Sequence, residues 1–204
     1  MHIECIPVGS YQTNCYVVFD DDKNCFIVDP GFEGPRIKRY IADNELHVQF
    51  IINTHGHIDH IGANHKFDVP VYIHEADSSF LTDPQKNLSV FFDDEYTFSG
   101  DVRHLSDNAI IEFAGRELRI IHTPGHTPGC ICVCMETMLF SGDTLFRESV
   151  GRTDLPYGDA VQLSKSLTVQ LLPLPNEMRV LPGHGAETTM AYEKKHNFYL
   201  SRIQ

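Results

Sequence analysis

The stretch Thr54-His55-Gly56-His57-Ile58-Asp59-His60 places three histidines and one aspartate within six positions. Side chains two residues apart in extended backbone point the same way, so His55 and His57 can approach one ion. Asp59 and His60 then reach a second point close by. Imidazole and carboxylate donors together suit zinc, iron or manganese. The stretch therefore predicts a metal site.

Further candidate donors lie at other strand ends. An apolar strand is predicted directly before the cluster, and loops at the ends of buried strands hold ligands rigidly while leaving them accessible. Three later strand ends carry His122 or His126, Asp143, and His184 between two glycines. The spacing alone does not decide between His122 and His126. Taken singly, Asp143 and His184 have ordinary explanations as turn or capping residues. Together, these donors match a site for two ions with space for water.

Composition indicates a soluble protein with an acidic surface. The chain has 204 residues, of which 42% are hydrophobic, enough for one substantial domain. Its formal net charge of -12 argues against nucleic-acid and anionic-membrane partners, because both favour a basic surface. No apolar stretch reaches the roughly 18–20 residues of a membrane span, and the first residues do not form a secretion signal. We expect a soluble, cytoplasmic protein.

The six cysteines are interpreted as free thiols. Cys130, Cys132 and Cys134 alternate along one predicted strand and share a face, which is poor geometry for a disulfide. The other three lie in separate short apolar runs, as buried thiols do. A metal clip built from the alternating cysteines is the alternative, but the apolar residues between them favour a core strand.

The hydrophobic pattern predicts two successive sets of strands and helices. The first half should contain strands at 3–7, 15–19, 25–29, 48–52 and 71–73, with helices at 35–44 and 75–81. The second half should contain strands at 109–113, 117–122, 130–135, 138–140 and 179–181, with helices at 159–171 and 188–200. Two such halves, 1–108 and 109–204, predict a single α/β domain in which two sheets pack together with helices outside.

Residues 83–108 show little periodicity but contain Phe91, Phe92, Tyr96 and Phe98. A long loop in a compact domain is either functional or mobile. We expect these aromatic side chains to cap a core, and a lid on the substrate side is the alternative.

The candidate residues resemble the motifs of the metallo-β-lactamase superfamily, over nearly the whole chain. Five motifs appear in order: Asp29 in Val28-Asp29-Pro30-Gly31, the cluster from His55 to His60, His126, Asp143 and His184. The resemblance implies an αββα sandwich of two mixed sheets. It also implies a first metal bound by His55, His57 and His126, a second bound by Asp59, His60 and His184, and Asp143 as the bridge. His122 is then a strand-end residue, and Asp29 a residue that orients a ligand.

Two segments indicate the branch of the superfamily. Gly142-Asp143-Thr144-Leu145-Phe146 and Gly151-Arg152-Thr153-Asp154 are similar to the glyoxalase II-related branch, which hydrolyses thioesters. Persulfide dioxygenases share both segments. Flavodiiron oxygen reductases carry an acidic residue at the position of His57, which argues against that branch. Nuclease branches need a basic surface, and this chain is acidic. Glyoxalase II proteins also carry a C-terminal helical domain that grips glutathione, whereas this sequence ends shortly after His184. We therefore expect a short, single-domain relative without that helical domain.

The resemblance implies a hydrolase with two divalent ions, zinc first, with iron or manganese as alternatives. A metal-bound water loses its proton near pH 7, which would give a bridging hydroxide that attacks an ester or thioester carbonyl. Thiolates have conjugate pKa values near 8.5 and leave without strong protonation, which favours a thioester. Asp59 would bind metal and also accept a hydrogen bond from the hydroxide.

The expected partner is a small, anionic thioester, and Arg152 could clamp its carboxylate through a planar fork. Arg147 and Tyr157 are weaker candidates, and surface salt bridging is the alternative for all three. A non-haem iron persulfide dioxygenase is the second functional reading, because a mononuclear set is contained in the same ligands. A metal-binding module without catalysis is the third, although all seven ligand positions are filled.

Overall fold

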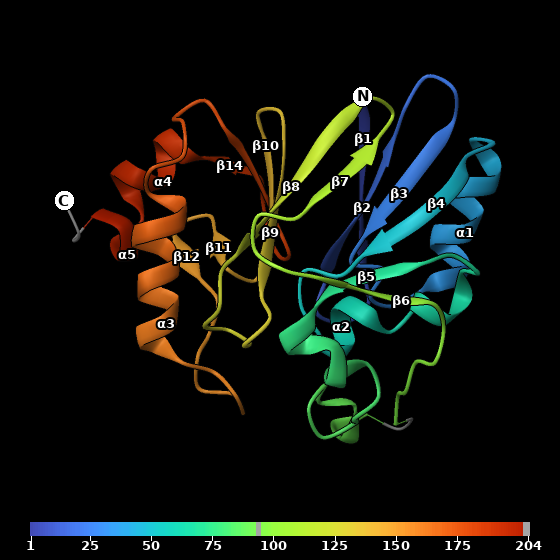
Figure 1. Cartoon of the computed structure of the whole chain (residues 1–204), viewed down its shortest axis with the longest axis horizontal. Helices are drawn as coiled ribbons and strands as arrows, with labels where there is room; N and C mark the ends of the chain where they lie inside the picture. The colour runs from blue at the N-terminus through green and yellow to red at the C-terminus, as the bar shows by residue number, and fades with distance from the viewer. Residues whose placement is uncertain (93–94, 202–204) are drawn as a thin grey trace. The chain divides into compact units, whose positions relative to one another are not determined.

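Each half of the chain builds its own six-stranded mixed sheet (Figure 1). The computed structural model describes residues 1–92 and 95–201. It divides into two compact units, Met1–His104 and Leu105–Gln204. Mixed sheets with helices in both units confirm the predicted α/β class. The prediction that both halves make up one domain stays a prediction.

The sheet of the first unit has the order β1-β2-β3-β4-β5-β6. The first three strands pair antiparallel, and β3, β4 and β5 pair parallel. Parallel neighbours require crossover connections, which here contain helices α1 and α2. The elements are β1 (His2–Val8), β2 (Thr13–Phe19), β3 (Asn24–Val28), α1 (Gly34–Asp43), β4 (His47–Ile52), α2 (Ile58–Ile61), β5 (Val71–His74) and β6 (Val102–Leu105).

Helices α1 and α2 cover one face of this sheet. Ile37 of α1 and Ile61 of α2 are fully buried in one core with Ile27 of β3. On the opposite face of the sheet, the rings of Phe26 and Phe50 stack with centroids 5.3 Å apart, and both are buried. Strands buried on both faces read as continuous apolar runs, which is why β3 and β4 were recognisable in the sequence.

The described residues between β5 and β6, 75–92 and 95–101, form short turns instead of long regular elements. The helix predicted at 75–81 is a 3-10 helix, η2 (Glu75–Leu81), and shorter 3-10 turns occupy η1 (Asn64–Lys66) and η3 (Ser89–Phe91). Phe98 is buried in the core, with Phe92 and Tyr96 packed against it, which confirms the core-capping prediction for these three. The prediction is wrong for Phe91, which is 81% exposed. Residues 93–94 of this predicted loop lie outside the described part of the chain.

The sheet of the second unit has the order β14-β13-β10-β9-β8-β7, in which only the β10–β13 pair is parallel. A two-stranded ribbon, β11–β12, follows β10. The strands are β7 (Ile110–Phe113), β8 (Arg116–His122), β9 (Ile131–Met135), β10 (Met138–Gly142), β11 (Leu145–Phe146), β12 (Ser149–Val150), β13 (Arg179–Pro182) and β14 (Thr188–Thr189).

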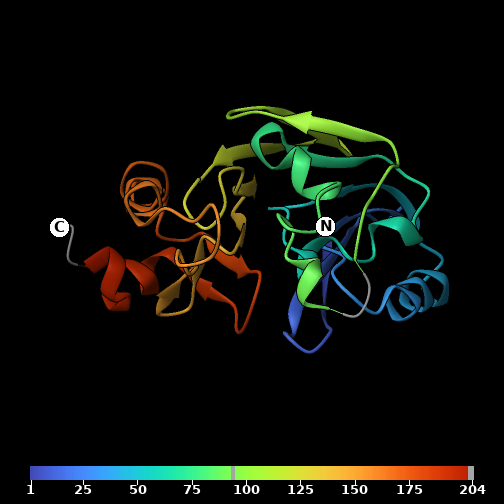
Figure 2. The same ribbon diagram turned by 90° about the horizontal axis from the view of Figure 1, so that it is seen from below.

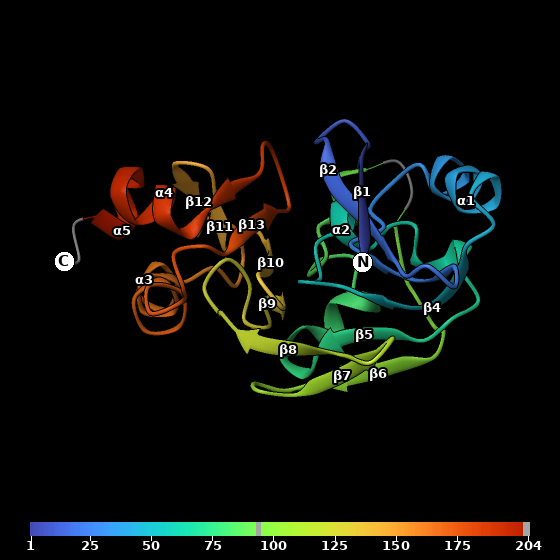
Figure 3. The same ribbon diagram turned by 90° about the horizontal axis from the view of Figure 1, so that it is seen from above.

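Helices of the second unit lie on one side of its sheet (Figures 2 and 3). Leu163 and Leu167 from the first helical segment pack with Cys132 and Leu139 of the sheet in one core. All six cysteines are free thiols, and burial raises the pKa of Cys132 to about 12. The helices are α3 (Ala160–Lys165), which continues as the π-helical η4 (Ser166–Leu171), α4 (Met190–His196) and α5 (Phe198–Ser201).

The continuous helix predicted at 188–200 is wrong at two points. Thr188 and Thr189 form strand β14, and the Thr189 hydroxyl accepts a hydrogen bond from the Tyr192 amide to cap α4. Asn197 then interrupts the helix because its side-chain amide donates to the carbonyls of Phe146 and Ser149. Among the described residues, no helix has the length and apolar character needed to cross a bilayer.

Candidate functional site

The histidine cluster follows β4 in the first unit and changes backbone conformation at its middle. His57 is extended, with φ -71° and ψ 147°, and the single helical turn of α2 begins at the next residue. The expected extended geometry therefore holds for His55 and His57, whereas Asp59 and His60 belong to a helical turn. Both conformations turn the donors of the cluster toward one another.

The donor atoms of the first unit are spaced as ligands of a metal ion are. The His55 Nε2 and His57 Nδ1 atoms are 3.1 Å apart, and the His60 Nε2 and Asp59 Oδ2 atoms are 3.5 Å apart. His55 and His60 also offer ring nitrogens within 4.8 Å of each other. A tetrahedral zinc ion with bonds of about 2.0–2.1 Å places neighbouring donors roughly 3.3 Å apart. The donor set fits a transition metal in both chemistry and spacing.

Asp29 lies beneath this donor set. Its buried carboxylate accepts hydrogen bonds from the Thr54 amide at 2.7 Å and the Thr54 hydroxyl at 2.6 Å. It also lies 2.9 Å from Nδ1 of His60. A carboxylate on Nδ1 keeps the proton on that nitrogen, so that Nε2 keeps its lone pair for a metal. Asp29 itself has φ +52°, a conformation that aspartate tolerates better than most residues.

Two supporting residues were missed in the sequence. The buried carboxylate of Asp77 in η2 accepts a hydrogen bond from the Gly56 amide at 2.9 Å, between the two paired histidines. The Thr13 hydroxyl donates to Oδ2 of Asp59 at 3.1 Å. Neither residue belongs to a recognisable motif, because an acidic residue early in a helix and a threonine in a strand have ordinary explanations. Their roles depend on contacts between distant segments.

Replacing Asp77 with alanine should weaken metal binding by the cluster. The Gly56 amide would lose its acceptor inside the protein, and removal of such a supporting partner typically lowers metal affinity 10- to 100-fold. Competition with a chromogenic chelator measures this change. Asp83→Ala is the matched control, since Asp83 also accepts a backbone amide, that of Gln85, but does not contact the cluster. Equal affinities in both variants would contradict the role given to Asp77.

The second unit carries its own donor set in the loop between β8 and β9 and just after β10 and β13. Oδ2 of Asp143 lies 3.6 Å from Nε2 of His126 and 3.5 Å from Nε2 of His184. These separations again match neighbouring ligands of one ion. The ring of Phe146 meets that of His184 edge-on, with centroids 6.0 Å apart. Asp143 is thus central to the second donor set.

The chain that follows β12 holds His126 and Asp143 in place. The Arg152 carbonyl lies 2.7 Å from Nδ1 of His126, which leaves Nε2 to face Asp143. A Cβ atom on Gly151 would lie 1.9 Å from the Asp143 carbonyl oxygen and 3.2 Å from Cβ of His126. Only glycine permits this approach.

His122 has a different environment from His126. It ends β8, and its Nε2 lies 2.8 Å from the Pro128 carbonyl. Its backbone amide donates to the carboxylate of Asp107. These contacts fit a strand-end residue.

The three predicted substrate residues lie in the second unit. The Arg152 guanidinium donates two hydrogen bonds of 2.7 Å to the two carboxylate oxygens of Asp154. The Arg147 guanidinium lies over the Tyr192 ring, 5.0 Å from its centroid. Tyr157 is 53% exposed, with φ +70°. The fork of Arg152 is therefore part of an exposed salt bridge, as the alternative for this residue stated, and its role as a substrate clamp stays a prediction.

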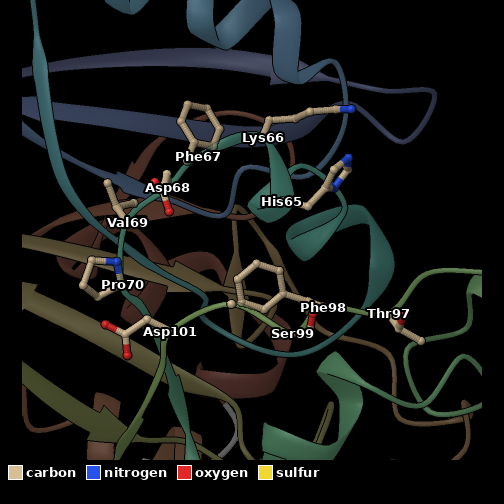
Figure 4. A pocket seen from close by; sticks show the side chains of 11 residues that line it. His65, Lys66, Phe67, Asp68, Val69, Pro70, Thr97, Phe98, Ser99 and Asp101 are labelled. Atoms are coloured by element: carbon tan, nitrogen blue, oxygen red, sulfur yellow. The ribbon is translucent and has the colours of Figure 1, made fainter.

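The described residues also line surface cavities. One of about 510 Å³ lies in the first unit, where Figure 4 shows the Phe98 ring with His65 on one side and Asp101 on the other. None of the predicted ligands lines it. Another, of about 420 Å³, lies in the second unit and includes Arg152 and Asp154 in its wall.

Comparisons with known proteins agree with this arrangement. A family model described as the Metallo-beta-lactamase superfamily matches residues 8–184. Hydroxyacylglutathione hydrolase GloC of Haemophilus influenzae is 35% identical, over 98% of this chain and 99% of that protein. Among solved structures, the BLEG-1 B3 metallo-beta-lactamase is 38% identical with a TM-score of 0.92, covering 98% of this chain and 100% of that one. TTHA1623 in a di-iron-bound form is 33% identical with a TM-score of 0.83, covering 97% and 100%. The predicted resemblance and fold type are confirmed.

Proposed function

The chain belongs to the metallo-beta-lactamase superfamily, and on that basis we propose that it is a metal-dependent hydrolase of small thioesters. The observation that carries the proposal is the ligand-like spacing of the donors within each unit. Similarity to a hydroxyacylglutathione hydrolase along nearly the whole chain supports a thioester substrate.

The proposed ligand set uses both groups of donors for two divalent ions. His55, His57 and His126 would hold the first ion and Asp59, His60 and His184 the second, with Asp143 as the bridge. Every one of these residues falls within the range that the family model matches. Zinc is the proposed metal on the grounds of donor chemistry, and the di-iron form of TTHA1623 makes iron the first alternative.

The chain's own residues would orient donors and protons for the reaction. Bound divalent ions would act as Lewis acids and lower the pKa of water toward 7. Asp29 and the Arg152 carbonyl hold protons on Nδ1 of His60 and His126, so that both Nε2 atoms present lone pairs. Thr13 fixes one oxygen of Asp59. Asp59 would also align the attacking water by accepting its hydrogen bond.

Substrate binding is proposed for Arg152, with Arg147 and Tyr157 as further candidates. The planar fork of Arg152 suits a carboxylate in both charge and shape. Thioesters are favoured over amides because a thiolate, with a conjugate pKa near 8.5, leaves without prior protonation. The proposed substrate is therefore an acyl thioester that carries a negative charge.

Metal removal tests the proposal directly. Purified protein should contain about two transition-metal ions per chain and release thiol from acyl thioesters. Dialysis against a chelator should abolish this activity, and added zinc should restore it. Fully metal-loaded protein that cleaves no thioester would refute the proposal. Oxygen consumption with a persulfide would instead identify an iron-dependent persulfide dioxygenase.

Similarity to BLEG-1 favours β-lactam hydrolysis as a second candidate activity. The leaving group of a β-lactam is an amine, which needs a proton that a thiolate does not. A chromogenic cephalosporin assayed beside the thioesters distinguishes the two. Faster turnover of the cephalosporin than of the thioesters would make β-lactam hydrolysis the first candidate activity.

A further inference from the structure

We propose that the cavity between segment 150–154, α3 and α5 binds an apolar chain ending in a carboxylate, and that Asp154 occupies the carboxylate's place when no ligand is bound. This inference rests on the proposed hydrolase function, because it names the class of acyl group that the enzyme prefers. It makes Asp154 a specificity-determining residue.

The cavity has the size and lining of a small-molecule site. Its volume of about 420 Å³ falls within the range of roughly 300–1,000 Å³ typical of such sites. One part of the wall is apolar and would shield a hydrocarbon chain from water. The other part is polar and contains the Arg152–Asp154 pair. The apolar residues of the lining are Val150, Ala160, Leu163, Leu167 and Tyr199.

The Arg152–Asp154 pair already has the geometry of a bound carboxylate. Nε and one terminal nitrogen of Arg152 each donate to a different oxygen of Asp154, both at 2.7 Å. The hydrogen bonds from Arg152 lower the pKa of the Asp154 carboxyl to about 2, so it stays ionised at neutral pH. A ligand carboxylate would make the same two bonds.

Exchange between the two carboxylates should cost little. The side chains of Arg152 and Asp154 are 63% and 68% exposed, so water solvates Asp154 well once it is displaced. Exposed ion pairs of this kind contribute little to stability. A ligand that also buries an apolar chain in the cavity would therefore outcompete Asp154, whereas a short anion without such a chain would not.

The cavity wall is directly connected to the second donor set. Arg152 lines the cavity, and its backbone carbonyl lies 2.7 Å from Nδ1 of His126. The neighbouring Gly151 lies against both His126 and Asp143. The residue that would bind the carboxylate thus also contacts a proposed metal ligand through its backbone, which suits an acyl group whose thioester carbonyl reacts at that ligand.

Asp154→Ala and Arg152→Ala test the inference with two thioesters of equal chain length. One carries a terminal carboxylate on its acyl chain, and the other is neutral. Asp154→Ala should lower the KM ratio of the acidic to the neutral thioester about 2- to 5-fold, because Arg152 loses its internal competitor. Arg152→Ala should raise that ratio by a similar factor, about 2- to 5-fold, because the ligand carboxylate would form the same kind of exposed pair with Arg152. Its alanine keeps the backbone carbonyl, so metal content should not change.

Glu136→Ala provides the matched control. Glu136 pairs with Arg116 in the same unit at 2.8 Å, with 52% exposure, and lines neither the cavity nor a donor set. The KM ratio should not change in this variant. If the KM ratio also stays constant in Asp154→Ala and Arg152→Ala, the inference is overturned. Measurable turnover in these variants would still support the hydrolase function.

A binding measurement separates failure of the inference from failure of the function. Calorimetry on metal-loaded protein would compare a non-hydrolysable thioether carrying the same acidic chain with its neutral analogue. The acidic thioether should bind more tightly than the neutral one. If this preference increases in Asp154→Ala and disappears in Arg152→Ala, the site is supported even without turnover. Binding that Arg152→Ala leaves unchanged would place the carboxylate elsewhere and refute the inference.

Discussion

Asp143→Asn is expected to abolish most thioester hydrolysis and to lower the bound metal below two equivalents per chain. Oδ2 of Asp143 faces the Nε2 atoms of both His126 and His184, so one substitution weakens every donor pair of the second unit. Asparagine keeps the shape but removes the charge that offsets a divalent ion. Loss of a supporting residue around a metal typically costs 10- to 100-fold, and loss of a ligand should cost at least about 100-fold.

Metal analysis and thiol release together check this prediction, and Asp159→Asn is the control. Asp159 caps α3 by accepting the amides of Val161 and Gln162, and asparagine is an equally good cap. The control should therefore keep its metal and activity. Asp143→Asn should still fold, because the backbone there is held by the Thr144 amide and the Ser141 carbonyl. A variant with two bound ions and full activity would remove Asp143 from the centre.

The sequence predicted the long elements well because their apolar patterns are strong. The strand expected at 48–52 is β4 (His47–Ile52), and the helix expected at 35–44 is α1 (Gly34–Asp43). Elements of two residues, such as β11 and β14, were missed because so short a run has no periodicity. The helix expected at 159–171 changes to a π-helix after Lys165, which hydrophobic spacing does not distinguish from an α-helix.

The candidate donors were easier to recognise in the sequence than the residues that hold them in place. His55, His57 and His60 stand out because several ligands share one short segment. Asp29 was found only through the resemblance, since an aspartate before a proline is an ordinary turn residue. Asp77 and Thr13 were not found, because each supports the cluster through a hydrogen bond to a segment at least 21 residues away in the sequence. Residues that support a site from a distance leave little trace in local sequence.

Asp29→Asn is expected to lower both metal affinity and stability. An asparagine amide group would face Nδ1 of His60 or the Thr54 amide, where the carboxylate now accepts. If it donates to Nδ1, the proton of His60 moves to Nε2, which then cannot bind a metal. We expect a 10- to 100-fold loss of metal affinity, measured by competition with a chelator.

Asp29→Ala should destabilise the fold more strongly than Asp29→Asn. It leaves the buried Thr54 amide without its acceptor, at a cost of about 1–3 kcal/mol, and alanine tolerates φ +52° poorly. For a chain of this length, each kcal/mol lowers Tm by roughly 2–4 °C. Thr54→Val removes the hydroxyl bond to Asp29 and the 3.3 Å contact of the same hydroxyl with Nδ1 of His55, but it leaves His60 in contact with the carboxylate. Thr54→Val should therefore lower Tm while costing less metal affinity than Asp29→Asn, and an equal loss of metal in the two variants would contradict the role given to the Asp29–His60 contact.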